Sequence, residues 1–182
     1  YGWAVIGGFS AAMKLNTFFL VALTALGSAV SSFSAQNIGA GKTGRVIQGL
    51  KASLGMALAV VVPFTLLYTV FAGSMMGLFV DAKETEIIAA GVQFLRVVSP
   101  FYIVIAGKLC ADGVLRGAGA MGPFMVATFS DLILRVVLSY VFAGWWDVLG
   151  IWLSWPVGWI IGTAASAAFV LSGVWKRHRQ ID

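Results

Sequence analysis

Residues 18–43 read FFLVALTALGSAVSSFSAQNIGAGKT, a long apolar run that ends in a polar, glycine-rich sequence. The last three residues, Gly41, Lys42 and Thr43, match the end of a phosphate-binding loop. Such a loop also has a glycine five positions before Gly41, and Gln36 stands there instead. It further needs a preceding strand inside an α/β domain. The composition of the chain therefore decides between a nucleotide site and a helix end.

The composition is typical of a membrane protein. Hydrophobic residues make up 60% of the 182 residues, charged residues make up 10%, and the mean hydropathy is +0.95. Soluble domains contain roughly 25% charged residues. An ordinary soluble domain is therefore excluded, and with it the nucleotide site. The single cysteine, Cys110, cannot form an internal disulfide and is interpreted as a small packing residue.

Five long apolar segments predict an all-α fold, a polytopic membrane helix bundle. A span needs about 20 apolar residues, and no segment shows the alternation typical of membrane barrel strands. The connections are short, so we expect successive helices to be antiparallel neighbours. The expected spans are residues 5–35, 46–72, 87–115, 121–143 and 149–174.

The lysines and arginines predict the orientation in the lipid bilayer. If the spans alternate in direction, seven basic residues fall on one side, and Lys83 falls on the other among acidic residues. By the positive-inside rule we expect the basic side, which includes the C-terminus, to be cytoplasmic. The net charge of +5 is thus a topology signal and does not indicate nucleic acid. The seven residues are Lys42, Arg45, Lys51, Arg116, Lys176, Arg177 and Arg179.

A second glycine-rich loop, GAGAMG at residues 117–122, formally matches the dinucleotide fingerprint GxGxxG. No strand is expected before it, and no acid stands about 20 residues later to hold a ribose hydroxyl. Glycine at this point is instead typical of a helix end. Pro123 then suits the first turn of the next helix.

Both loops together carry a resemblance to a known family. The stretch ALGSAVSSFSAQNIGAGKTGRVIQGL, followed by VLRGAGAMGPF, resembles the second half of a multidrug and toxic compound extrusion (MATE) transporter. The order of an acidic loop between the two motifs and a basic end also fits. The motif residues that carry the resemblance are Gln36, Asn37, Gly39, Gly41, Arg116, Gly117 and Gly119.

The resemblance implies a fold and a function. Such transporters have twelve spans in two six-helix bundles, so residues 1–182 would be a partial C-terminal bundle, helices eight to twelve of a longer protein. The missing N-terminal bundle would then be a partner. The implied activity is secondary antiport, in which amphipathic or cationic small molecules leave in exchange for sodium or protons. No cofactor is expected: the coupling ion would be sodium or a proton, and no nucleotide would be hydrolysed.

Ionisable residues inside spans cost about 2.5 to 3.5 kcal/mol each at mid-bilayer and therefore indicate function. Lys14 and Asn16 lie in the first expected span. Members of the family often carry an acid where Asn16 stands, so a coupling carboxylate is missing there. Lys14 is expected either to line the transport cavity or to make structural hydrogen bonds.

Two acid–base pairs have the spacing of one helix face. Lys108 and Asp112 lie in the third expected span, where Asp112 serves either ion coupling and gating or a structural pairing with Lys108. Asp131 and Arg135 lie in the fourth, where the pair either fixes the orientation of the helix or takes part in gating.

Two alternatives to antiport remain open. A lipid-linked oligosaccharide flippase of the same superfamily would need a larger and more basic cavity, to which Lys14, Lys108 and Arg96 would contribute. A non-transporting membrane subunit would keep its charges fully paired inside a closed bundle. We expect neither an enzyme nor a metal site, because the sequence lacks HExxH, GxSxG and clustered histidine, cysteine and aspartate.

Overall fold

The fold is an all-α bundle, as predicted, in a computed structural model that describes residues 2–179. The side chains of Arg177 and Arg179, used above for the orientation, lie outside the described part. In chain order the described helices are α1 (Trp3–Gly39), α2 (Thr43–Val70), α3 (Ala72–Met76), α4 (Thr85–Val98), the 3-10 helix η1 (Ser99–Phe101), α5 (Tyr102–Gly117), α6 (Met121–Leu171) and the 3-10 helix η2 (Val174–Arg179).

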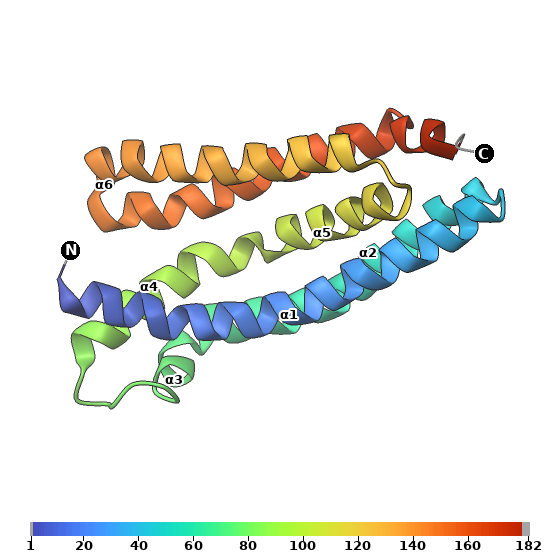
Figure 1. The fold of residues 1–182 in the computed structure, drawn as a ribbon. Helices are drawn as coiled ribbons and strands as arrows, with labels where there is room; N and C mark the ends of the chain where they lie inside the picture. The colour runs from blue at the N-terminus through green and yellow to red at the C-terminus, as the bar shows by residue number, and fades with distance from the viewer. Residues whose placement is uncertain (1, 180–182) are drawn as a thin grey trace.

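Four helices of the described chain are long and apolar enough to cross a membrane. They are α1, α2, the combined segment Thr85–Gly117, and α6. The longest, α6, has 51 residues but is not straight, because Trp146 and Asp147 have non-helical backbone angles. Figure 1 shows that α6 turns back on itself, so that its first arm (residues 121–145) and second arm (residues 148–171) lie side by side. Each arm is longer than the roughly 20 residues that a span needs.

The segment Thr85–Gly117 is interrupted where α4 meets α5. Pro100 lacks a backbone N–H, which breaks a regular α-helix, and Ser99–Phe101 form η1 there. Two threonines of α2 satisfy polar groups at the break: Thr65 Oγ1 donates to the carbonyl of Ser99 at 3.1 Å, and Thr69 Oγ1 lies 2.9 Å from Ser99 Oγ. The interruption is therefore anchored to a neighbouring helix, as a break at membrane depth requires.

Close contact between α1 and α5 depends on glycine. A Cβ at Gly113 would lie 2.6 Å from the carbonyl oxygen of Gly27, and a Cβ at Gly117 would overlap the carbonyl of Ser31. Small residues at such crossings let two backbones approach each other in a membrane. The approach fixes the position of α5, which carries Lys108 and Asp112.

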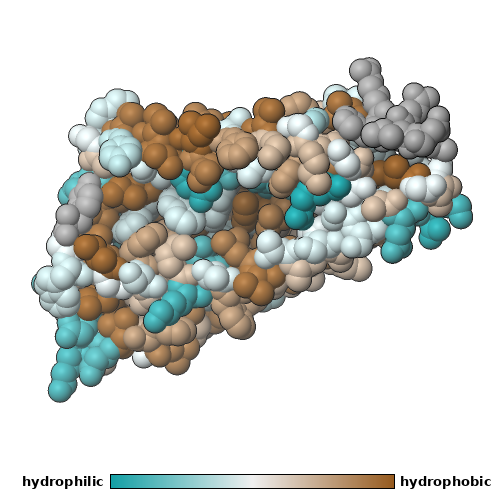
Figure 2. Space-filling model, in the orientation of Figure 1, coloured by the Kyte–Doolittle hydropathy of each residue, from teal (hydrophilic) through white to brown (hydrophobic). Residues whose placement is uncertain are grey.

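Hydrophilic residues gather at the two ends of the bundle, and Figure 2 shows a few more between the ends. In Figure 1 the α1–α2 and α5–α6 connections lie at the same end as the C-terminus, and the α3–α4 connection and the turn of α6 lie at the other. Large apolar side chains between the ends are exposed, among them Phe18, Val62 and Ile133. Figure 2 shows hydrophobic residues along the α6 arm at the top and hydrophilic residues at the lower left and at the right. This distribution suits a bundle surrounded by lipid.

Candidate functional site

The glycines of the two sequence motifs lie at helix ends. Gly41 and Gly119 have φ values of 73° and 71°, in the left-handed region that glycine adopts without strain. At the first motif the N–H of Lys42 donates to the carbonyl of Asn37 at 2.7 Å, which closes the end of α1. The motifs therefore terminate α1 and α5, and neither follows a strand in the described chain.

The remaining motif residues also shape these ends. Asn37 Nδ2 donates to the carbonyl of Phe33 at 2.8 Å, whereas Gln36 and Gly39 are exposed. The guanidinium of Arg116 lies 5.6 Å from the ring centroid of Phe124, at the start of α6. Since these contacts are local, we assign the motifs to helix termination and packing.

The intramembrane charges form the candidate site. The two predicted ion pairs, together with one serine, meet where α5 packs against both arms of α6. We call this set the charged cluster; it consists of Lys108, Asp112, Asp131, Arg135 and Ser166.

Asp112 is fully engaged within the cluster. Its Oδ2 lies 2.6 Å from Lys108 Nζ, and its Oδ1 accepts a hydrogen bond from Ser166 Oγ on the second arm of α6. Only 3% of Asp112 and 4% of Lys108 is exposed. A buried pair of this kind is tolerated because each charge has a partner and the remaining carboxylate oxygen is hydrogen-bonded.

Asp131 is less completely engaged. Its Oδ2 lies 3.4 Å from Arg135 Nη2, which is long for a charge-assisted hydrogen bond. Its Oδ1 is buried and has no hydrogen-bond partner among the described residues. The guanidinium of Arg135 also lies 4.9 Å from the ring centroid of Trp155, within the range of a cation–π contact.

The two ion pairs lie against the same glycine, Gly162. A Cβ at Gly162 would lie 2.8 Å from both Lys108 Cε and Asp131 Cβ, and a Cβ at Gly158 would lie 2.8 Å from Asp131 Oδ1. Lys108 and Asp131 therefore lie side by side over Gly162. The cluster thus contains two acids and two bases, of which Lys108, Asp112 and Asp131 are buried and Arg135 is partly exposed.

Lys14 and Asn16 do not join the charged cluster. Asn16 is buried and its Oδ1 accepts a hydrogen bond from Tyr102 at 2.9 Å, so it links α1 to α5. Lys14 is exposed on α1, with its Nζ 5.9 Å from the ring centroid of Phe79. The structure therefore separates the four residues predicted for the transport pathway into Lys108 with Asp112, Asn16 in the core, and Lys14 on the surface.

Sequence reasoning missed part of the cluster. Ser166, Gly158 and Gly162 are not among the candidate residues of the sequence analysis. The signal was their spacing, because residues 158, 162 and 166 follow one another at four-residue intervals on one helix face. A stripe of small residues opposite Lys108 and Asp131 leaves room for charged side chains.

The cluster offers carboxylate, amine and guanidinium groups, which can exchange protons and ion-pair partners. Within the described part of the chain, no group of three histidine, cysteine, aspartate or glutamate residues could hold a metal ion. The buried free oxygen of Asp131 is an acceptor without a donor, which is costly unless it binds a proton or another donor.

Comparisons with known proteins agree with the motifs and the fold. The MatE family model matches residues 1–141. A probable multidrug resistance protein of Bacillus subtilis (strain 168), YpnP, is 30% identical over 177 residues, which cover 97% of this chain and 39% of that protein. A second from the same organism, YoeA, is 22% identical over 182 residues, 98% of this chain and 39% of that protein.

The chain thus spans about two fifths of the length of these relatives. No solved structure matches it significantly. The family model covers most of the described helices, including both glycine motifs and the Asp131 pair. Because the family model matches more than half of the chain, the chain belongs to the MatE family, the MATE transporters.

Proposed function

We propose that this chain is the C-terminal part of a secondary active exporter of amphipathic or cationic small molecules, and that proton entry through the charged cluster drives export. The names of YpnP and YoeA support multidrug export as the activity of the family branch. A second bundle from the same longer protein would complete the transport cavity. The protein would lie in the cytoplasmic membrane with its C-terminus inside, because the basic residues gather at that end.

The observation that carries the proposal is the free oxygen of Asp131. Buried ionisable residues in membrane helices are costly and usually mark ion pathways. Both oxygens of Asp112 and one of Asp131 already have partners, so one carboxylate oxygen is available.

This donor set favours a proton over sodium. A proton needs one oxygen, whereas hard metal cations take several oxygen ligands. Lys108 and Arg135 would also repel a further cation. Protonation of Asp131 would remove the negative charge near Lys108 and Arg135. These two side chains would then shift toward Asp112 or solvent, and the packing of α5 against α6 would change.

The test is dye export by the full-length protein in proteoliposomes, under separately imposed proton and sodium gradients. We expect a proton gradient to drive export, Asp131→Asn to abolish it, and Asp112→Asn to impair it severely. Asp81→Asn is the matched control, since Asp81 is exposed in the α3–α4 connection and should leave export unchanged. Export driven by sodium alone would refute proton coupling, and the absence of export under either gradient would refute the transport function.

A further inference from the structure

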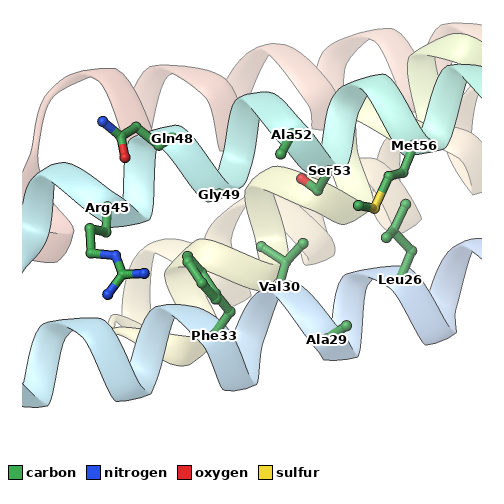
Figure 3. Close-up of a pocket in the computed structure, with 10 residues that line it drawn as sticks. All are labelled: Leu26, Ala29, Val30, Phe33, Arg45, Gln48, Gly49, Ala52, Ser53 and Met56. Carbon is green, nitrogen blue, oxygen red and sulfur yellow. The ribbon is translucent and has the colours of Figure 1, made fainter.

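A groove lies between α1 and α2, close to the basic end of the bundle, and none of its lining residues belongs to the charged cluster. Its volume is about 390 Å³, and its lining residues come from α1 and α2. Figure 3 shows Arg45 and Gln48 at one end of the groove and Leu26 and Met56 at the other. The polar end is the one nearest the α1–α2 connection, and the opposite end, with Leu26 and Met56, is apolar.

The walls of the groove are apolar and accessible. Phe33 and Met56 line it with 37% and 61% of their surfaces exposed, and Ala29 and Ala52 leave space between the helices. A Cβ at Gly49 would overlap the ring of Phe33, so glycine lets this ring lie against α2 and form one side of the groove. An exposed apolar groove in a membrane helix pair suits an acyl chain.

The dimensions fit one leaflet. Arg45 and Met56 are eleven residues apart on α2, which corresponds to about 16 Å along a helix. Half of the hydrocarbon core is about 15 Å thick. An acyl chain that begins at the level of Arg45 would therefore reach Met56 near the bilayer midplane.

The charge at the polar end selects the headgroup. Arg45 forms no ion pair in the described structure, and no aspartate or glutamate precedes Asp81 in the sequence. Gln48 beside it adds hydrogen-bonding capacity, and a guanidinium binds phosphate oxygens in a bidentate manner. We propose that this groove is a binding site for an anionic phospholipid, with its phosphate on Arg45 and one acyl chain between α1 and α2.

A helix of the longer protein could cover the same surface. An apolar helix would explain the walls but not the unpaired guanidinium at the headgroup level, which a phosphate explains directly. The unpaired guanidinium therefore favours a phospholipid over a helix as the occupant of the groove. Because the site shares no residue with the charged cluster, it can be tested independently of proton-driven export.

The experiment is a lipid titration of the purified full-length protein by native mass spectrometry. The probes are dioleoyl phosphatidylglycerol and dioleoyl phosphatidylcholine, which differ only in the headgroup. We expect phosphatidylglycerol to bind more tightly. Arg45→Gln should weaken its binding about fivefold, the effect of one basic residue at an anionic headgroup, and should leave phosphatidylcholine unchanged.

Matched variants separate the groove from general charge and folding effects. Lys42→Gln removes a neighbouring charge outside the groove lining and should change affinity by less than the Arg45 substitution. Ala52→Trp should fill the groove and remove the bound lipid, whereas Ala164→Trp, at an exposed position of α6 outside the groove, should not. Equal binding of both lipids by the unmodified protein, an unchanged headgroup preference in Arg45→Gln, or lipid retained by Ala52→Trp would each overturn the proposal.

Discussion

Lys108 lies near two acids from different helices: its Nζ pairs with Asp112, and its Cε and the Cβ of Asp131 both lie over Gly162. Removing one partner of a buried pair leaves an uncompensated charge and typically costs about 3 to 5 kcal/mol. We expect Lys108→Met to lower the free energy of unfolding of the full-length protein by that amount, as measured by denaturation in detergent.

A double variant tests the reason for this loss. If the cost arises from the stranded carboxylate, then Lys108→Met combined with Asp112→Leu should recover most of the stability, because no buried charge is left unpaired at that site. Export would remain impaired in both variants. A double variant as unstable as the single one would show that Lys108 acts through its packing instead.

Gly162 lies against two members of the charged cluster, Lys108 and Asp131. An added Cβ would meet Lys108 Cε and Asp131 Cβ at 2.8 Å, a distance at which one of them must move. Overpacking of this kind typically costs about 1 to 3 kcal/mol, so Gly162→Ala should lower the thermal midpoint and reduce export. Gly122→Ala, also in α6 but with nothing within 4 Å of the added atom, should show neither effect.

At the scale of the element, α6 is defined by its turn. Asp147 has φ 53° and ψ −132°, a conformation that is strained for any residue but glycine. We expect Asp147→Gly to stabilise the protein by about 1 kcal/mol, the strain relieved less the entropy that glycine adds. Thermal unfolding of the full-length protein measures this, and Asp147→Ala, which keeps a Cβ, should give no gain. Equal stabilisation by both would mean that the carboxylate is unfavourable and the backbone is not strained.

The helices were largely predictable from hydrophobicity. The turn of α6 falls in the short polar connection between residues 143 and 149, as the apolar runs on either side indicated. The five-residue helix α3 was not foreseen, since its sequence AGSMM continues the apolar run of α2 without a separate pattern. Short helices after a span depend on local packing, and composition alone does not reveal them.

The site was predictable only within each helix. The pairs Lys108–Asp112 and Asp131–Arg135 follow from a four-residue spacing, and both form. That Asp131 lies beside Lys108, and that Ser166 donates to Asp112, depends on how α5 crosses both arms of α6. A crossing of this kind is set by side-chain packing, which a hydrophobicity pattern does not specify. Asn16 illustrates the same limit, because its partner Tyr102 lies 86 positions away.

At the scale of the whole molecule, the charged connections divide between two ends of the bundle. Lys42 lies in the α1–α2 connection and Lys83 in the α3–α4 connection, at opposite ends in Figure 1, and both are exposed. Most of the basic residues lie at the end with Lys42, so we predict from the positive-inside rule that this end faces the cytoplasm.

This orientation can be tested with a membrane-impermeant maleimide on intact cells. The background is a cysteine-free full-length protein in which Cys110, buried in α5, is replaced by alanine. We expect Lys83→Cys to react in intact cells and Lys42→Cys to react only after permeabilisation, because the reagent does not cross the membrane and the α1–α2 connection is predicted to face the cytoplasm. The reverse pattern would invert the bundle, and it would place Arg45 and the lipid groove in the outer leaflet. The anionic-lipid site would then have to be filled from outside, so the labelling result also decides which leaflet supplies that lipid.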